Sequence, residues 1–306
     1  MNFNAGIFAG KSALHVPLQD VGYALGSSQY QISVLRDDLI HPFISGNKMR
    51  KLKYNLIRFR ENGKKILLTF GGAFSNHLVA VAAASKENGF KSIGIVRGEE
   101  VENDYLNFSK QAGMHLHFIS RSDFRNKGSI DYLKSLVDEF ISIGLIDDEK
   151  DVFILPEGGA NEEAVRGAAE IMDDIPATTN IIAVACGTGA TLAGITRRLL
   201  PHQHAIGISV LKAENYFENE LVRLGGKLSN TTIIYDYHFG GYAKKSVMLD
   251  DFIRKFMSKT GIPIEPVYSG KLFFAIDDLT KQGYFKKGSK VTLIHTGGIF
   301  NFNSSL

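Results

Sequence analysis

The fold follows from one stretch of the chain, Ile181-Ile182-Ala183-Val184-Ala185-Cys186-Gly187-Thr188-Gly189-Ala190-Thr191-Leu192. Its first part is apolar and rich in β-branched residues, which is typical of a buried strand. Two glycines then interrupt the pattern, and from Leu192 the apolar spacing is that of a helix. A strand that enters a helix through a short glycine turn is the unit from which α/β proteins are built.

Outward from this stretch, the same alternation continues from about Ile66 to the end of the chain. We expect strands at Ile66–Phe70, Ser92–Val96, His115–Ile119, Val152–Leu155, Ile181–Ala185, Ile206–Leu211, Thr231–Tyr235 and Val291–His295. We expect helices at Leu78–Asn88, Asp104–Ala112, Ile130–Ile143, Glu162–Met172, Leu192–Leu200, Val247–Thr260 and Lys271–Gln282. Short apolar runs between longer helical segments predict parallel β-α-β units, hence an α/β fold.

The composition favours a globular protein of two domains. The chain has 306 residues, of which 44% are hydrophobic and 22% charged. No low-complexity linker separates the domains, and such proteins usually insert one domain in the other, with a ligand cleft between them.

Charge and cysteine content exclude several classes of partner and site. Lys and Arg number 35 against 32 Asp and Glu, a net charge of +3 without long like-charge blocks. We therefore expect neither nucleic acid nor an acidic membrane as a partner. Cys186 is the one cysteine, so an internal disulfide and a Cys-rich zinc site are excluded. We expect no metal at the histidine pairs His115/His117 and His202/His204 either, because no arrangement of carboxylates surrounds them.

No targeting or membrane segment is expected. The longest uncharged stretch, Ile175–Thr196, contains Pro176 and three glycines and is therefore no membrane helix. The N-terminal residues lack a basic region followed by an apolar core, so we expect a cytoplasmic protein.

The first chemical motif is Ser45-Gly46-Asn47-Lys48-Met49-Arg50-Lys51-Leu52. If a helix starts at Gly46 or Asn47, then Lys48 lies in its first turn. The positive helix end, Arg50 and Lys51 should lower the pKa of Lys48, which a lysine needs to react as an uncharged amine. The structural alternative is an ordinary basic helix start in contact with solvent.

The second motif is Gly71-Gly72-Ala73-Phe74-Ser75-Asn76-His77, between an apolar strand and a helix of small residues. Ser75 or Asn76 can cap that helix, and the exposed N–H groups and hydroxyls suit an anion. Capping alone would explain either residue, but it does not explain Ser, Asn and His together behind two glycines.

The turn from Gly187 to Thr191 can cradle one phosphate through successive N–H donors and two hydroxyls. It is not a P-loop, and Leu192 stands where a dinucleotide-binding motif has its third glycine. A generic strand-to-helix turn is the structural alternative. Cys186 fits a small buried residue better than a nucleophile.

The last motifs are Glu265–Lys271, ahead of a helix, and His295-Thr296-Gly297-Gly298, after the last strand. Both are strand-end positions, where ligands bind in open α/β sheets. Gly240-Gly241-Tyr242 adds a tyrosine to that of Tyr268, although a single tyrosine is more often a packing residue.

Six segments together resemble the pyridoxal-phosphate enzyme family that contains 1-aminocyclopropane-1-carboxylate (ACC) deaminase and D-cysteine desulfhydrase. The resemblance runs from about Ile32 to Gly298. It implies a tryptophan-synthase-β-like fold (fold type II), with two domains of open, mostly parallel twisted sheets flanked by helices. The segments, in the family's order, are Gly-Asn-Lys-x-Arg-Lys-Leu, Ser-Asn-His, Pro-Glu-Gly-Gly-x-Asn, Gly-Thr-Gly-x-Thr, Pro-Val-Tyr-Ser-Gly-Lys and His-Thr-Gly-Gly.

The resemblance also implies roles for particular residues. Lys48 would carry pyridoxal phosphate covalently, and its freed amine or a tyrosine hydroxyl would act as the base. Asn76 would hydrogen-bond the ring oxygen of the cofactor and face the substrate. Ser75 and His77 would bind the substrate, and Tyr242 and Tyr268 would line its pocket. Ser75 and both tyrosines are also candidate catalytic residues. Further expected cofactor contacts are Gly187, Thr188, Gly189, Ala190, Thr191, Ser269 and Thr296.

Two positions help to choose a substrate within the family. ACC deaminases carry Glu after the pocket tyrosine and Leu before the last Gly-Gly, whereas this chain has Ser269 and Thr296, as in D-cysteine desulfhydrases. A hydroxyl supports ring protonation less than a carboxylate does, which suits a good thiolate leaving group. We expect a lyase or hydrolase of amino-acid metabolism that converts D-cysteine to pyruvate, hydrogen sulfide and ammonia.

Other functions remain open. The nearest is ACC deaminase, which releases 2-oxobutyrate and ammonia. A second is a catalytically weak pyridoxal-phosphate or anion-binding protein, and a third is a nucleotide binder. By resemblance we expect a homodimer with a small inserted domain at 52–155. The large cofactor-binding domain would comprise 1–51 and 156–306.

Overall fold

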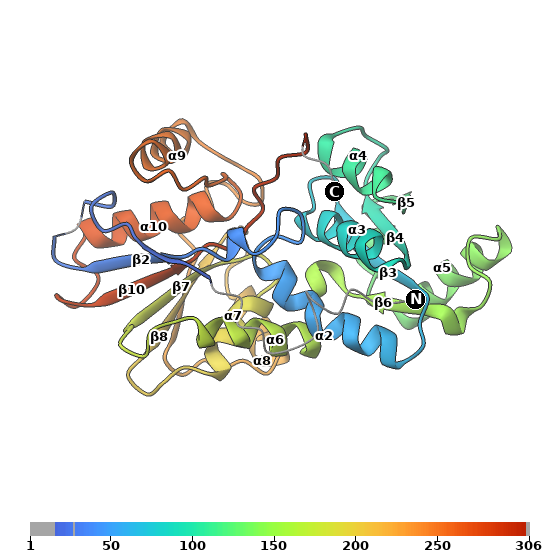
Figure 1. The fold of residues 1–306 in the computed structure, drawn as a ribbon, viewed down its shortest axis with the longest axis horizontal. Coiled ribbons are helices and arrows are strands. Elements are labelled where there is room, and N and C mark those ends of the chain that lie inside the picture. The colour runs from blue at the N-terminus through green and yellow to red at the C-terminus, as the bar shows by residue number, and fades with distance from the viewer. Residues whose placement is uncertain (1–15, 27, 304–306) are drawn as a thin grey trace. The chain divides into compact units, whose positions relative to one another are not determined.

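The computed structural model of the protein describes residues 16–26 and 28–303 (Figure 1). It confirms the α/β fold with mostly parallel sheets. The described residues form two compact units, 16–51 with Glu162–Ile299 and 52–161 with 300–303. The smaller unit thus extends past Leu155, because Gly159 packs beside His77 and Asn161 hydrogen-bonds to Asn55.

The larger unit contains a sheet of six strands in the order β1-β2-β10-β7-β8-β9. Only β1 runs antiparallel to its neighbour. Neither β1 nor β2 was expected from the sequence, because the alternation of strands and helices becomes regular only after them. The strands are β1 (Leu18–Asp20), β2 (Gln31–Leu35), β7 (Ile181–Cys186), β8 (His204–Ser209), β9 (Thr231–Ile234) and β10 (Lys290–Ile294).

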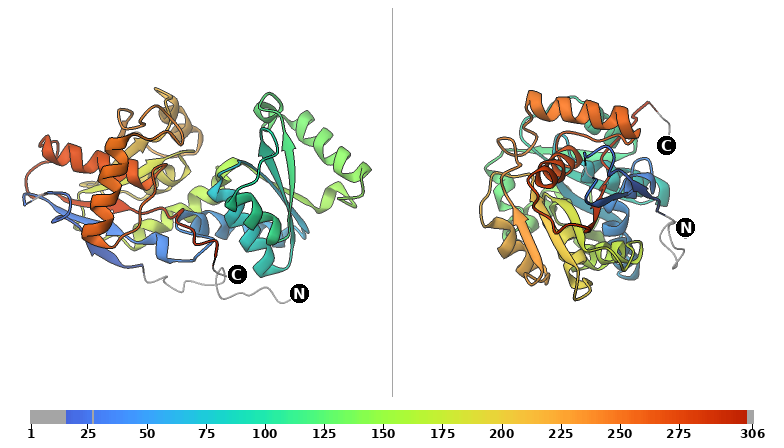
Figure 2. Two further views of the ribbon diagram at one scale, coloured as in Figure 1. Left: turned by 90° about the horizontal axis from the view of Figure 1, so that it is seen from above. Right: turned by 90° about the vertical axis from the view of Figure 1, so that its left-hand side faces the viewer.

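Helices cover both faces of this sheet (Figure 1; Figure 2, right). On one face lie α9 (Val247–Thr260) and α10 (Ser269–Lys281). On the other lie α6 (Glu162–Ala169), α7 (Ala190–Arg197) and α8 (Tyr216–Arg223), of which α8 was not expected.

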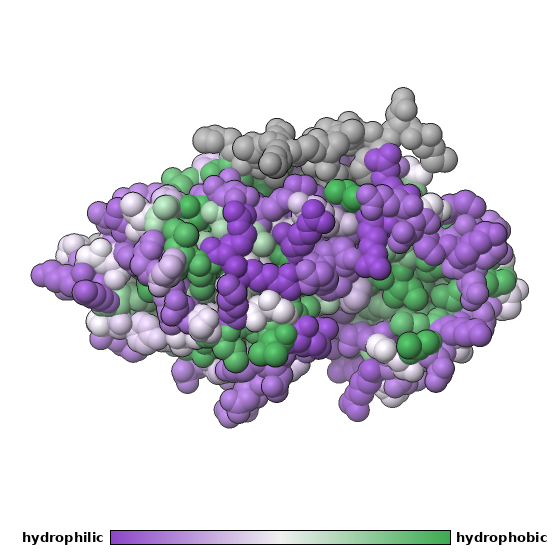
Figure 3. Space-filling view, turned by 90° about the horizontal axis from the view of Figure 1, so that it is seen from below, coloured by the Kyte–Doolittle hydropathy of each residue, from purple (hydrophilic) through white to green (hydrophobic). Residues whose placement is uncertain are grey.

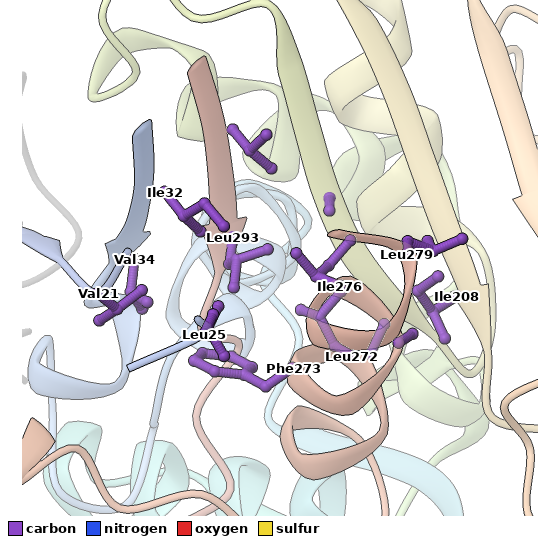
Figure 4. Close-up of a cluster of buried hydrophobic side chains, with 14 of the residues drawn as sticks. Val21, Leu25, Ile32, Val34, Ile208, Leu272, Phe273, Ile276, Leu279 and Leu293 are labelled. Carbon is purple, nitrogen blue, oxygen red and sulfur yellow. The ribbon is translucent and has the colours of Figure 1, made fainter. Parts of the chain in front are cut away.

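The core of the larger unit lies between the sheet and α10 (Figure 4). Leu272, Ile276 and Leu279 recur at helical spacing and are buried against the sheet. Leu293 of β10 and Ile208 of β8 meet them from the strands. Each such side chain contributes ~1.5–3 kcal/mol when fully buried, which holds α10 firmly on the strands.

The smaller unit contains a sheet of four parallel strands in the order β5-β4-β3-β6. Its α5 buries Leu136, Val137 and Phe140 against this sheet. Its alanine-rich α3 is buried along most of its length. The elements are β3 (Ile66–Gly72), β4 (Lys91–Arg97), β5 (Met114–Ile119), β6 (Val152–Leu155), α3 (Asn76–Asn88), α4 (Asp104–Gln111) and α5 (Ile130–Ser142), and α2 (Asn47–Glu61) belongs to both units.

Hydrophilic side chains cover most of the face drawn in Figure 3, and the apolar ones form separate small groups. Among the described residues, no helix combines the length and the apolar character needed to cross a membrane.

Helices α6 and α7 pack unusually closely because glycine lies at their contact. A Cβ on Gly194 of α7 would lie 2.7 Å from both Ala169 N and Val165 O of α6. These are backbone atoms inside a helix, so they cannot move aside easily.

We therefore expect Gly194→Ala to lower the free energy of unfolding by ~1–3 kcal/mol through overpacking, as measured by denaturant unfolding. Gly128→Ala is the matched control, because a Cβ there meets nothing within 4 Å, and it should change stability by less than ~0.5 kcal/mol. Equal effects of the two substitutions would contradict the close packing of α6 on α7.

Candidate active site

Three loops of the larger unit start at the same edge of its sheet. Because β7, β8 and β10 are parallel neighbours or near neighbours, their carboxyl ends lie together. The loops that follow them begin at Gly187, Val210 and His295. Ligands of open α/β sheets bind at such an edge, so it is the candidate site of this unit.

The helix α2 begins in backbone contact with the loop after β10. The N–H of Asn47 donates to the carbonyl oxygen of Thr296 over 3.3 Å. Gly46 has a φ of +60°, and a Cβ there would lie 2.1 Å from the same oxygen. Only glycine therefore allows this approach, which brings the first turn of α2 beside Thr296.

Asn47 links Lys48 to the turn after β7. Its side-chain carbonyl accepts a hydrogen bond from Lys48 Nζ over 2.9 Å. Its amide donates to Thr191 Oγ1, also over 2.9 Å. The amine of Lys48 is thus held one side chain away from the Gly187–Thr191 turn.

The pKa of Lys48 is lowered to about 8, and burial is the cause. The sequence argument predicted the lowered pKa but named the positive helix end, Arg50 and Lys51 as its causes, where burial is the cause. The Arg50 guanidinium binds both carboxylate oxygens of Asp37, over 2.7 and 2.8 Å, and one of Asp174 over 2.6 Å. These two carboxylates therefore neutralise the charge of Arg50.

Lys51 is a candidate site residue that the sequence argument treated only as a neighbouring charge. Its side chain is buried, and Nζ lies 3.4 Å from Thr188 Oγ1. Burial and the charge of Lys48 both lower its pKa well below the ordinary value. The spacing of three residues places Lys48 and Lys51 on one face of α2, and this spacing was the available signal.

The turn from Gly187 to Thr191 has the donors that a phosphate requires. Gly189 has a φ of +78° and directly precedes α7, whose first N–H groups have no partner within the helix. Thr188 and Thr191 supply hydroxyls, and Lys51 supplies an amine whose charged form a bound phosphate would favour. An amine with a pKa of about 8 at Lys48 suits an aldehyde, so these residues fit pyridoxal phosphate.

Tyr268 and Tyr242 lie together beside the same turn. A Cβ on Gly187 would lie 2.9 Å from Tyr268 Cε1, so this glycine makes room for the ring. The hydroxyls of Tyr268 and Tyr242 are 3.4 Å apart, with the rings edge to face. The structure therefore brings both predicted pocket tyrosines to one place.

Ser269 is the first residue of α10 and is buried. Its hydroxyl accepts the N–H of Glu265 over 2.9 Å and donates to Glu265 Oε1 over 3.1 Å. The same carboxylate accepts the N–H groups of Val267, Tyr268 and Ser269. Glu265 therefore caps α10 and orients the Ser269 hydroxyl.

The Ser75-Asn76-His77 segment lies in the smaller unit, at the start of α3. Ser75 caps that helix by accepting the N–H of Leu78 over 3.3 Å, and Asn76 is half-buried. His77 is buried, with Nε2 2.8 Å from Thr69 Oγ1. Both Ser75 and His77 thus have structural partners, and their contact with a substrate stays a prediction.

Cys186 is buried at the end of β7, and burial raises the pKa of its thiol to about 12. It is therefore an inert packing residue, as the sequence indicated.

Comparison with known proteins indicates the same cofactor as the geometry of the site does. A family model described as "Pyridoxal-phosphate dependent enzyme" matches residues 15–297. An Arabidopsis thaliana protein named mitochondrial bifunctional D-cysteine desulfhydrase/ACC deaminase is 30% identical, over 88% of this chain and 72% of that protein.

Two further relatives carry the name of one of these activities. The ACC deaminase of Rhizobium rhizogenes is 29% identical, over 83% of this chain and 82% of that one. A crystal structure of an ACC deaminase homologue superposes with a TM-score of 0.79 at 29% identity, covering 93% of this chain and 90% of the other.

The family match spans far more than half of the chain and includes every residue of the Lys48 and Gly187–Thr191 contacts. The chain belongs to the family of pyridoxal-phosphate dependent enzymes.

Proposed function

We propose that this enzyme eliminates and deaminates a small amino acid, with D-cysteine as the preferred substrate. The products would be pyruvate, hydrogen sulfide and ammonia, with one water consumed. The observation that carries the proposal is the Lys48 amine, with a pKa of about 8, which Asn47 joins to Thr191 of the phosphate-fitting turn.

Three groups of residues would hold the cofactor, at its aldehyde, its phosphate and its ring. Lys48 would bind the aldehyde carbon of the cofactor covalently. The turn from Gly187 to Thr191, which includes Ala190, would bind the phosphate together with Lys51. Ser269 and Thr296 would contact its ring from the larger unit, and Asn76 would hydrogen-bond its ring oxygen. The support within the structure is the contact of Lys51 with Thr188 and of Asn47 with Thr296.

Bound pyridoxal phosphate would supply an electron sink for the pair released from the substrate Cα–H bond. Lys48, once its amine is free and uncharged, would take the α-proton. The Tyr268 hydroxyl would give a proton to the departing sulfur, and Tyr242 would hold Tyr268 in place. Ser75 and His77, with the N–H groups at the start of α3, would bind the substrate carboxylate.

The hydroxyl at position 269 favours D-cysteine over ACC. The Ser269 hydroxyl accepts the backbone N–H of Glu265 and donates to its carboxylate. The hydroxyl therefore lies between the charged carboxylate and the cofactor ring that Ser269 would contact. A ring that is protonated less strongly suffices for a thiolate leaving group. The second candidate, ACC deamination, is favoured by the names of two relatives. A homodimer in the cytoplasm stays a prediction from the sequence.

We expect the purified enzyme to release sulfide and pyruvate from D-cysteine at least tenfold more efficiently than it releases 2-oxobutyrate from ACC. The comparison is of kcat/KM for the two substrates, with L-cysteine as the stereochemical control. Preference for ACC would overturn the argument from Ser269 and Thr296. A bound chromophore without product from any of them would favour a catalytically weak binding protein.

We expect Lys48→Ala to abolish the visible absorbance band of the covalently bound cofactor and to reduce kcat by at least ~10³-fold, because both the covalent bond and the base are lost. The readouts are the absorbance spectrum and the turnover rate. Lys255→Ala on the exposed face of α9 is the matched control and should change neither. A band that survives in Lys48→Ala would disprove the assignment.

We expect Lys51→Met to weaken cofactor affinity about tenfold or more, because it removes one charge-assisted contact of ~1.5–3 kcal/mol to the phosphate. Fluorescence titration of the apoenzyme with pyridoxal phosphate and with pyridoxal separates the phosphate contribution from that of the ring. If both ligands weaken equally, Lys51 does not act on the phosphate.

A further inference from the structure

Lys271 stands out because its position is unfavourable for a lysine on two counts. Its side chain is completely buried, which is rare for lysine. It also lies in the first turn of α10, where the positive end of the helix disfavours a cation. Neither the proposed chemistry nor cofactor binding uses this residue, so its role must come from what it contacts.

The ammonium of Lys271 donates to three backbone carbonyl oxygens. The distances from Nζ are 2.8 Å to Gly241 O, 2.9 Å to His238 O and 3.5 Å to Val210 O. Val210 follows β8, and the other two residues belong to the loop after β9. A lysine ammonium has three N–H groups, so this one side chain joins α10 to two loops at the candidate site.

The loop that Lys271 contacts has a backbone of uncommon conformation. Phe239, Gly240, Gly241 and Ala243 all have positive φ values, of 53°, 95°, 121° and 56°. Two of these residues carry side chains, for which such values are uncommon and costly. The loop contains neither helix nor strand from 238 to 243. Hydrogen bonds from the N–H groups of Gly240 and Gly241 to His238 support it from within, and contacts with other elements add to them.

Tyr242 is the residue of this loop that the site would use. Its hydroxyl lies 3.4 Å from that of Tyr268, which directly precedes α10. Tyr268 therefore contacts the loop at Tyr242, and Lys271 contacts its backbone, while Phe274 of α10 packs edge to face on Phe239. The polar contacts with the loop thus come from the residue before α10 and from its first turn.

We propose that Lys271 is a positioning residue that holds the 238–243 loop on α10 and thereby sets the place of Tyr242 beside Tyr268. The proposal rests on the proposed function in so far as the two tyrosines line the substrate pocket. Lys271 would act through Tyr242, and it does not itself touch the substrate. Burial lowers the pKa of Lys271 to about 8 and Glu265 opposes this shift, so the donating ammonium prevails at neutral pH.

The main test is limited proteolysis of Lys271→Met, which keeps an apolar stem and removes the three N–H donors. Lys244 and Lys245 are exposed and adjoin the loop. We expect trypsin to cleave after them at least about tenfold faster in the variant, because the loop opens more often. Cleavage after the exposed Lys286 and Lys287, beyond α10, is the internal control and should not change.

A second test restores the cation without the side chain. Lys271→Ala should show the same rapid cleavage, and millimolar methylammonium or ethylammonium should slow it by occupying the three-carbonyl site. Tetramethylammonium carries no N–H and should have no effect. Slow cleavage in both variants would overturn the proposal. It would also be overturned if tetramethylammonium slowed the cleavage as much as methylammonium and ethylammonium do.

The kinetic consequence separates positioning from general loss of structure. Lys271→Met should raise KM about tenfold with a smaller change in kcat, whereas Tyr242→Ala should raise KM and leave the loop resistant to trypsin. If neither substrate is turned over, the proposed function fails while the proteolysis result still decides the role of Lys271.

A labelling experiment on the unmodified enzyme covers the case in which the variants do not fold. Acetic anhydride should modify Lys244 and Lys245 at least tenfold faster than Lys271, as followed by mass spectrometry. Reaction of Lys271 at the rate of these exposed lysines would overturn the proposal.

Discussion

The site in the larger unit depends on one close contact of two backbones, that of Gly46 with Thr296. The carbonyl oxygen of Thr296 lies where any Cβ on residue 46 would have to be. Since Gly46 has no Cβ and adopts a positive φ, α2 can begin directly against the loop after β10. The orientation of this helix then decides where the side chains of Asn47, Lys48 and Lys51 lie.

Three basic side chains in the first turns of α2 have different surroundings: Arg50 is neutralised, whereas Lys48 and Lys51 lie near the turn after β7. Arg50 is bound by Asp37 and Asp174 and is therefore compensated. Lys48 and Lys51 are instead directed toward Asn47 and Thr188, which are neutral groups. Burial lowers the pKa of both lysines. The same arrangement gives one amine, that of Lys48, that can lose its proton near neutral pH. It also gives a second amine, that of Lys51, which a bound phosphate would keep charged beside the donors of the turn.

The start of α10 organises the other side of this edge. Its hydrophobic face is embedded in the core, so the backbone there is rigid (Figure 4). Glu265 occupies the N–H groups at its end and orients Ser269. Tyr268 fits against Gly187, and Lys271 reaches the carbonyl oxygens of the 238–243 loop. One helix start thus contacts the turn after β7 and the loop after β9.

Local sequence patterns were sufficient for most elements of the fold. The alternation of short apolar runs with helical spacing predicted β3 to β10 within a few residues of their ends, because burial of one face imposes its period on adjacent residues. It did not predict β1, β2 or α8, which are short or lie where the alternation is irregular.

The sequence by itself determined the α/β class, the glycine turn after β7 and the position of Lys48 in the first turn of a helix, because each depends on neighbouring residues. Only the tertiary structure decided that Asn47 bridges to Thr191, that Lys51 reaches Thr188 and that Lys271 holds a loop some thirty residues away. These contacts join residues that are distant in the chain, and their geometry exists only once the sheet has brought its strand ends to one edge.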